Sequence, residues 1–185
     1  DNFDFNFQPS LNVEYLKDLM ELSFVAQRQA LLILGKTGTG KTHIAAALGN
    51  LACHARFKVR FYSLQKLLSV LYTSLADGTT DDVITMLSRF DLLIIDNVNN
   101  IRTKPEYPSL LLDLISFCHE YTSFIVTSPI SLEDWGPALG DPVIINAIID
   151  RLLHNAHIIN IREGLSYRTE GPNALKLSPF LSSSQ

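Results

Sequence analysis

The stretch Ala30–Thr42 reads ALLILGKTGTGKT, a short apolar run followed by a glycine-rich loop. Gly35 and the triplet Gly40-Lys41-Thr42 complete G-x-x-x-x-G-K-[ST], the pattern of a phosphate-binding loop. Its glycines let successive backbone N–H groups turn toward phosphate oxygens. The residues that follow, HIAAALGNLACHA, are typical of a helix whose positive amino-terminal end faces the same anion. A chance match is the alternative, but the flanking strand and helix favour a nucleotide site.

Individual positions of this loop predict individual contacts. Lys41 brings a cation to the β- and γ-phosphates, and the Thr42 hydroxyl can ligate magnesium. We expect ATP or ADP with Mg²⁺ as the cofactors. The residues assigned to bind them are Gly35, Lys36, Thr37, Gly38, Thr39, Gly40, Lys41, Thr42 and His43.

Length and composition indicate one globular domain. The chain has 185 residues, enough for a single sizeable core and too few for two ordinary domains, so we treat residues 1–185 as one ATP-binding domain. No apolar run approaches the ~20 residues of a membrane span, and we expect no membrane partner. With 15 basic and 19 acidic side chains the net charge is −4, which does not support coating of nucleic acid by bulk charge and leaves a local basic patch open.

The start of the chain and its two cysteines indicate a fragment of a cytoplasmic protein. The chain begins at Asp1 without an initiator Met, so we expect a fragment that lacks an N-terminal domain of the intact protein. No charged-then-apolar leader follows, which argues against a secretory signal. Cys53 and Cys118 lie far apart, and we expect both to be buried thiols in a reducing cytosol. The expected location is cytoplasmic.

Strands and helices are expected to alternate along the chain. Runs of apolar and β-branched residues predict strands at 30–34, 58–62, 91–96, 123–127 and 157–161. Apolar residues at helical spacing predict helices at 11–27, 43–55, 64–75 and 110–121, a short one from Thr80, and one that opens at Asp141-Pro142. This alternation, with strands apolar throughout, indicates an α/β fold whose parallel sheet is covered on both faces.

Several local details carry their own expectations. Ser10 is expected to cap the first helix, with Val13, Leu16, Met20 and Phe24 on its buried face. Thr80 is expected to cap the short helix, with Asp81 and Asp82 in its first turn. The alternating Phe3, Phe5 and Phe7 predict an entry segment packed on the core, and stacking of one ring on an adenine base is the alternative.

A second nucleotide motif is the segment 91–96, DLLIID. A buried strand that ends in a carboxylate, here Asp96, fits the Walker B pattern, in which the carboxylate holds magnesium directly or through water. Such a strand is common in α/β proteins. The phosphate loop upstream favours the magnesium interpretation, with Thr42 and Asp96 as the metal residues.

Taken together, the motifs resemble one family. FDFNFQPS, GKTGTGKTHIAAALG, LADGT, DLLIID, IVTS, W-G-x-x-x-G-D-P-V ending in DRLLH, and GLSYR occur in the order typical of IstB-type transposition helper ATPases, relatives of the DnaC-type helicase loaders within the AAA+ ATPases. The resemblance implies a three-layer P-loop AAA+ core with a five-stranded parallel sheet, its edge strand following the phosphate-loop helix. It also implies head-to-tail homo-oligomers on DNA that act with a transposase or a replicative helicase.

Two positions depart from that family. Its Walker B Asp is usually followed by a Glu that activates the attacking water, and this chain has Asn97. An amide can hold a water but cannot take its proton, and loss of a general base typically costs roughly 10²–10⁴ in rate. The family's sensor Asn after IVTS is replaced by Pro129, which leaves Thr127 or Ser128 as substitutes. Hydrolysis is therefore expected to be weak.

The resemblance also implies roles for two arginines. Arg151 matches the arginine finger that reaches the γ-phosphate of the neighbouring subunit and completes the catalytic set Lys41, Asp96, Asn97 and Arg151; a solvated surface Arg is the alternative. Arg168 matches the family's Arg near its own nucleotide, but only 24 residues follow Ile161, so we expect a reduced or absent C-terminal lid.

The DNA-contacting insertion of this clade corresponds to residues 63–89. Lys66 and Arg89 are its basic residues, against Asp77, Asp81 and Asp82, which is thin for phosphate binding. Arg102 and Lys104, in the loop after Asp96, are further candidates.

Three functional hypotheses remain. The leading one is an ATP-binding protein that assembles on DNA to assist insertion-sequence transposition, with a DnaC-type helicase loader as its close variant. The second is a nucleotide-gated scaffold without hydrolysis, which Asn97 and Pro129 favour. The third, a small P-loop kinase, lacks the several lid arginines that such an enzyme needs.

Overall fold

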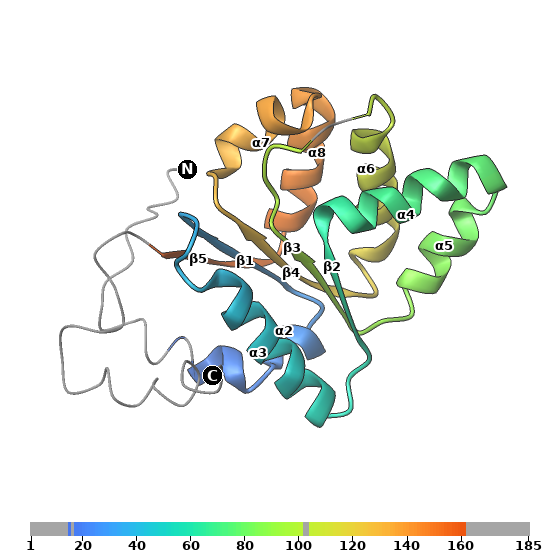
Figure 1. The fold of residues 1–185 in the computed structure, drawn as a ribbon. Coiled ribbons are helices and arrows are strands. Elements are labelled where there is room, and N and C mark those ends of the chain that lie inside the picture. Colours follow the sequence, from blue (N-terminus) through green and yellow to red (C-terminus); the bar gives the residue numbers. More distant parts are fainter. Residues whose placement is uncertain (1–14, 16, 102–103, 162–185) are drawn as a thin grey trace.

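Five parallel strands form the centre of the molecule. The computed structural model describes residue 15, residues 17–101 and residues 104–161 (Figure 1). The strands pair in the order β2-β3-β4-β1-β5, and every pairing is parallel. The predicted sheet and the edge position of the strand after the phosphate-loop helix are confirmed. The strands are β1 (Ala30–Gly35), β2 (Val59–Ser63), β3 (Leu92–Asp96), β4 (Ser123–Ser128) and β5 (Ala156–Ile161).

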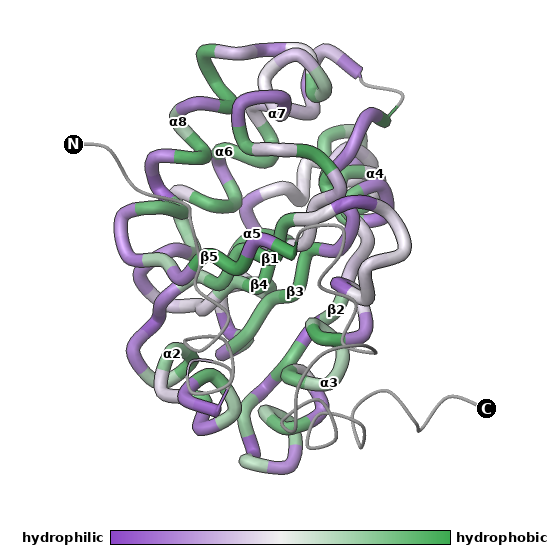
Figure 2. The backbone as a smooth tube through the Cα atoms, turned by 90° about the vertical axis from the view of Figure 1, so that its left-hand side faces the viewer, coloured by the Kyte–Doolittle hydropathy of each residue, from purple (hydrophilic) through white to green (hydrophobic). Residues whose placement is uncertain are grey.

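Helices cover both faces of this sheet, which confirms the three-layer prediction. Figure 1 shows α2 (Ser23–Ala26) and α3 (Lys41–His54) on one face, and α4 (Leu64–Asp77), α6 (Tyr107–Cys118), α7 (Leu132–Leu139) and α8 (Pro142–Leu153) on the other. Figure 2 shows apolar strands running between these layers. Along β1, Leu31 and Ile33 join the core under α3, whereas Leu32 and Leu34 join the opposite core. Because both faces of the central strands are buried, β1 is apolar along its length, whereas the edge strand β2 carries exposed residues.

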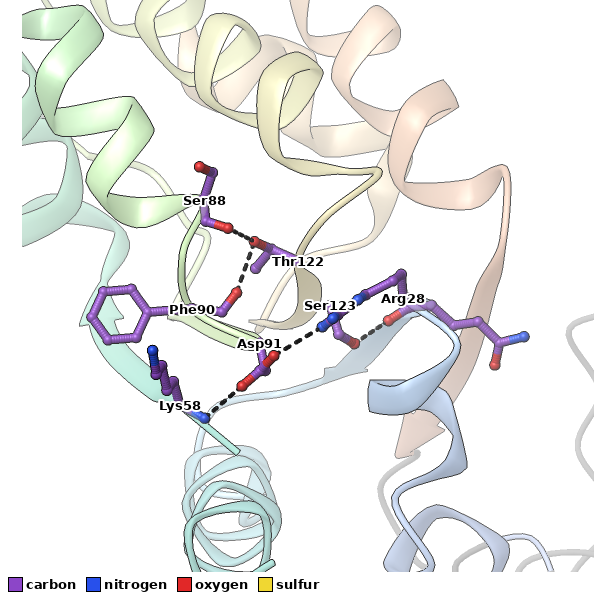
Figure 3. A network of polar contacts seen from close by, with 8 residues as sticks. Arg28, Lys58, Ser88, Phe90, Asp91, Thr122 and Ser123 are labelled. Carbon is purple, nitrogen blue, oxygen red and sulfur yellow. Dashed lines mark hydrogen bonds and ion pairs between the residues drawn. The ribbon is translucent and has the colours of Figure 1, made fainter. Parts of the chain in front are cut away.

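Polar contacts connect the amino-terminal ends of the strands, at the opposite end of the sheet from the phosphate loop (Figure 3). The backbone N–H of Lys58 donates to Asp91 Oδ2 at 2.8 Å, and the Arg28 guanidinium lies 3.2 Å from Asp91 Oδ1. The Ser123 N–H donates to the Asp91 carbonyl at 2.9 Å, and its hydroxyl donates to the Gln29 carbonyl. Asp91 therefore links the entries of β2, β3 and β4.

Most helix boundaries follow the predicted signals, with three corrections. Gly78 ends α4 in the left-handed conformation, and the Asp141 side chain caps α8 by accepting from two backbone N–H groups. Thr80 does not cap the short helix α5 (Thr80–Leu87); Thr79 is the capping position, and the Thr80 hydroxyl contacts Ser74 instead. Observed α6 begins at Tyr107, three residues before the predicted start. Helix α7 was not predicted, because Pro137 lies inside it and disfavours a helix.

The predicted continuous helix over residues 11–27 is wrong. Residues 17–20 are helical, but Leu22 adopts φ 59°, and a separate short helix α2 begins at Ser23. On the expected apolar face Phe24 is buried, but Met20 is 37% exposed and the neighbouring Leu19 is buried in its place at 2%. The expectations for Ser10, Val13, Leu16 and the aromatic triplet lie outside the described residues.

The cysteine expectation is half right. Cys118 is buried, and burial raises the pKa of its thiol to about 12. Cys53 is exposed on the last turn of α3, contrary to prediction. Among the described residues, no helix combines the length and apolar character needed to cross a membrane. The expectation of a reduced or absent C-terminal lid and the role of Arg168 concern residues 162–185, which lie outside the described part.

A hydrogen-bonded chain holds the first described segment against β5. The Tyr15 hydroxyl contacts His157 Nδ1 at 2.6 Å, and His157 Nε2 contacts Gln29 Oε1 at 2.6 Å. Burial raises the pKa of Tyr15 to about 12, so its hydroxyl keeps the proton that it donates to Nδ1. Nε2 then carries the ring proton, and the imidazole is neutral.

The half-buried, neutral His157 in these hydrogen bonds predicts that the stability of the protein depends on pH. Burial lowers the pKa of His157, so the unfolded state binds its proton more readily than the folded state. The free energy of unfolding should therefore fall as pH drops below about 6.5, the ordinary histidine pKa. Urea unfolding between pH 7.5 and 5.5 should show a shallower fall for His157→Gln than for the parent. The exposed His154→Gln is the control, and equal slopes for all three proteins would contradict the prediction.

Candidate functional site

The phosphate loop connects the end of β1 to the start of α3, as predicted. Gly38 and Gly40 have φ values of 83° and 86°, and a Cβ at either position would meet no atom within 4 Å. Their positive φ, rather than lack of space, therefore calls for glycine. Gly35 is different, because a Cβ there would lie 2.5 Å from the carbonyl oxygen of Ile161. The loop begins where β1 and β5 approach too closely for any side chain.

Lys41 lies within this loop rather than in solvent. Its side chain is 7% exposed, and Nζ donates to the Lys36 carbonyl at 2.7 Å, with Thr39 Oγ1 at 3.4 Å. Burial lowers the pKa of Lys41, and the negative charge of Asp96 opposes that shift. The Lys41 ammonium and the Asp96 carboxylate therefore interact electrostatically near the start of α3.

The carboxylate of Asp96 joins the phosphate loop to the sheet. Thr42 Oγ1 lies 2.9 Å from Asp96 Oδ1 and 3.2 Å from Oδ2. From the other side, Thr127 Oγ1 donates to Asp96 Oδ1 at 2.6 Å. The structure therefore brings Lys41, Thr42 and Asp96 together, and it adds Thr127 to them.

Strand register explains why Thr127 reaches Asp96. Ile95 of β3 pairs with Val126 of β4, so the next residue of each strand lies side by side at the carboxyl edge of the sheet. Ile94 and Ile125, two residues earlier, both belong to the core under α3. Because alternate side chains share a face, Asp96 and Thr127 also project toward the α3 side.

Ser128 projects to the opposite face, away from Asp96. Its hydroxyl contacts the Val98 carbonyl and accepts a hydrogen bond from Trp135 Nε1 at 3.0 Å. Ser128 is fully buried, and Trp135 is 2% exposed. Of the two substitutes that the sequence left open, Thr127 lies beside Asp96, and Ser128 fastens α7 to the loop after β3.

Asn97 directly follows Asp96 and is exposed. Its φ is 65°, a left-handed conformation that Asn adopts more readily than most residues. Its backbone N–H donates to Thr127 Oγ1 at 2.9 Å, and the next N–H, of Val98, donates to the Thr127 carbonyl at 2.8 Å. The backbone of this loop is therefore held by β4 while the Asn97 amide faces outward.

A cavity of about 330 Å³ adjoins the phosphate loop at the carboxyl ends of β1, β4 and β5. Its volume lies at the lower end of the range for small-molecule sites, roughly 300–1,000 Å³. Asn160 of β5, which the sequence reasoning missed, contributes an amide here; a polar residue in the apolar run HIINI was the available signal. The cavity is lined by Leu34, Gly35, Lys36, Pro129, Ile130, Ser131, Asn160 and Ile161.

The remaining predicted site residues lie around this centre or outside the described part. His43 is exposed on the first turn of α3. Arg151 is exposed in the last turn of α8, where its guanidinium donates to the Ala147 carbonyl of the same helix at 3.0 Å. Within the described residues, the hydrogen-bonded group of Thr42, Asp96 and Thr127 does not include Arg151, and the arginine-finger role stays a prediction.

Sequence comparison identifies the family. The family model described as IstB-like ATP binding protein matches residues 1–173. The chain belongs to the IstB-like ATP-binding proteins. This agrees with the resemblance carried by the phosphate loop, the Walker B strand and the segment around Trp135.

Curated relatives of this IstB-like chain are named for insertion sequences. One is named as an ATP-binding protein of insertion sequence IS232, from Bacillus thuringiensis subsp. berliner, and is 35% identical over 168 residues. Another is named as an ATP-binding protein of IS21, from Pseudomonas aeruginosa, and is 36% identical over 168 residues. Each match covers 91% of this chain and 67% or 63% of the relative, so the chain spans about two thirds of their length.

Solved structures share the fold of this IstB-like domain. The DnaC helicase loader superimposes with a TM-score of 0.66 at 16% identity, covering 86% of this chain and 93% of that one. AMPPCP-bound DnaA from Aquifex aeolicus gives 0.66 at 22% identity, covering 86% of this chain and 48% of that one. These likenesses confirm the predicted fold, a parallel sheet between layers of helices.

The Trp135–Ser128 contact predicts a measurable stability effect. Ser128→Ala leaves the buried indole N–H without its acceptor, so the free energy of unfolding should fall by about 1–3 kcal/mol. Urea unfolding measures it. Ser88→Ala, which removes an exposed hydroxyl bonded to the Thr85 carbonyl, is the matched control and should change stability much less. A similar loss in both variants would show that the buried indole contact contributes little.

Proposed function

We propose that this domain binds MgATP at the phosphate loop and assembles head to tail on DNA to assist insertion-sequence transposition. The observation that carries the proposal is the contact of Thr42, the last residue of the phosphate loop, with the Walker B carboxylate of Asp96 at 2.9 Å. That contact places an oxygen pair that can bind a metal ion beside Lys41 and the amino end of α3, where phosphate groups would bind. The insertion-sequence names of the relatives support the biological setting.

The donor set suits magnesium. Mg²⁺ prefers oxygen ligands and is commonly held by one or two protein groups together with substrate phosphates. The Thr42 hydroxyl and the Asp96 carboxylate supply such oxygens side by side. Bound with ATP, the ion would neutralise charge on the phosphates. Lys41 and the N–H groups at the start of α3 would hold the phosphates themselves.

Weak hydrolysis follows from the residue after Asp96. The Asn97 amide can orient a water but cannot accept its proton. Asp96 is the one carboxylate in the hydrogen-bonded group around Thr42 among the described residues, and it is committed to two hydroxyls. ATP binding, with γ-phosphate contacts across the subunit interface, would then drive assembly more readily than turnover.

The second candidate is a nucleotide-held scaffold without hydrolysis, which the outward-facing Asn97 favours. A DnaC-type helicase loader is a further alternative within the same fold, supported by the likeness to the DnaC loader. The binding partner distinguishes transposition from helicase loading, because the first requires a transposase and the second a replicative helicase.

Steady-state MgATP turnover, with and without duplex DNA, tests hydrolysis. Lys41→Ala should abolish nucleotide binding. Asn97→Glu should raise turnover by about 10²–10⁴ if a missing general base is the limit. Asn97→Gln is the matched control, since Gln has the same length as Glu and the same backbone strain at φ 65° but carries no carboxylate. Equal turnover for the Glu and Gln variants would rule out position 97 as the base position, and failure of the parent to bind ATP would overturn the proposal.

A mixing experiment tests the role of Arg151 in trans. Arg151→Ala should bind ATP like the parent but lose ATP-dependent assembly on duplex DNA, measured by light scattering. An Arg finger can also be worth about 10³–10⁵ in turnover. Mixing Arg151→Ala with Lys41→Ala subunits should restore part of the lost turnover, because each supplies what the other lacks. Lys17→Ala, which removes an exposed cation elsewhere, is the control; unchanged assembly by Arg151→Ala would favour a merely solvated arginine.

A further inference from the structure

The buried hydroxyl of Thr127 stands between two functional groups of the site. Thr127 is 1% exposed, and its Oγ1 lies 2.6 Å from Asp96 Oδ1 and 2.9 Å from the backbone nitrogen of Asn97. The sequence offered Thr127 as a substitute for the sensor residue that contacts the γ-phosphate, whereas in the structure its hydroxyl contacts the Walker B carboxylate.

The direction of each hydrogen bond follows from the donors available. The Asn97 N–H can only donate, so Thr127 Oγ1 accepts from it. The single hydroxyl proton of Thr127 then has Asp96 Oδ1 as its acceptor. The Asn97 N–H is a backbone group at the end of β3, so its position is set by the strand. The Thr127 hydroxyl is buried, so without Asp96 Oδ1 its proton would lack the acceptor that the structure gives it.

These bonds make the two oxygens of Asp96 unequal. Oδ1 receives the Thr127 hydroxyl at 2.6 Å and the Thr42 hydroxyl at 2.9 Å, whereas Oδ2 has only the longer 3.2 Å approach of Thr42. A carboxylate oxygen can accept about two hydrogen bonds. Oδ1 is therefore used as an anchor, and Oδ2 is the oxygen that retains capacity toward a metal ion or its water.

We infer that Thr127 is a positioning residue that holds Asp96 Oδ1 so that Oδ2 faces the magnesium ion of bound MgATP. This inference rests on the nucleotide site proposed above. Groups that orient a metal ligand from behind commonly change metal affinity by about 10–100-fold when removed. The hydrogen bonds that the described residues make to the Asp96 carboxylate come from the hydroxyls of Thr42 and Thr127, and Thr127 is the buried one of the two.

The test separates magnesium binding from nucleotide binding. A fluorescent ATP analogue is titrated in EDTA, and Mg²⁺ is then titrated into the protein with the analogue present. Thr127→Val should raise the Mg²⁺ concentration for half-saturation by about 10–100-fold and leave the EDTA affinity within about threefold. Thr127→Ser, which keeps the hydroxyl, should stay close to the parent. Thr127→Cys, whose thiol is a weak donor, should behave like Val and serves as a second variant should Val disturb folding.

Ser128→Ala is the structural control, since it removes the neighbouring buried hydroxyl on the opposite face of β4 and should not shift the Mg²⁺ half-saturation. Equal Mg²⁺ half-saturation for the parent, Val and Cys variants would overturn the inference while leaving the nucleotide site intact. An equal shift in the Ser variant, or in Ser128→Ala, would also overturn it, because the effect would then follow packing rather than the hydroxyl. A parent protein that fails to bind the analogue would instead overturn the proposed function.

Discussion

Side-chain alternation in paired parallel strands is the constraint from which the site is built. In a parallel sheet, residues at matching positions of neighbouring strands project to the same face. The pairing of Ile95 with Val126 therefore places Asp96 and Thr127 together on the side of α3. A slip of one residue in β4 would turn Thr127 into the opposite core and bring Ser128 to the carboxylate.

The same alternation lets adjacent residues of β4 serve the two layers separately. Thr127 contacts the nucleotide-loop side, while Ser128 accepts from Trp135 and contacts the carbonyl of Val98 on the other side. Burial of these polar groups is tolerated because they are paired; no buried side-chain nitrogen or oxygen among the described residues lacks a partner. Thr127 and Ser128 thus hold the loop after β3 from opposite faces of the sheet. Ser128 also binds Trp135 of α7 at the carboxyl end of β4.

Electrostatics gives this edge its chemical character. Lys41 is withdrawn from solvent near the negative charge of Asp96, and the amino end of α3 adds the positive end of a helix dipole. Such an arrangement suits phosphate and a divalent cation. It does not by itself suit proton abstraction, because the position after Asp96 carries an amide on a left-handed backbone. The geometry of this domain therefore suits nucleotide binding better than it suits abstraction of a proton from water.

Local sequence signals determined much of this protein. The phosphate loop, the apolar strands and the Asp141-Pro142 helix start depend on interactions within a few residues, and the sequence predicted each of them. The break at Leu22 and the Pro137-containing helix α7 were not, because packing against the sheet overrode local preference there.

Only the tertiary structure decided between Thr127 and Ser128, because that choice depends on how β4 pairs with β3, which places Thr127 beside Asp96, 31 residues away in the chain. The same holds for Asn160, which reaches the phosphate loop through the pairing of β5 with β1. Sequence alone determined which residue types can hold a nucleotide; the pairing of distant strands determined which of them meet.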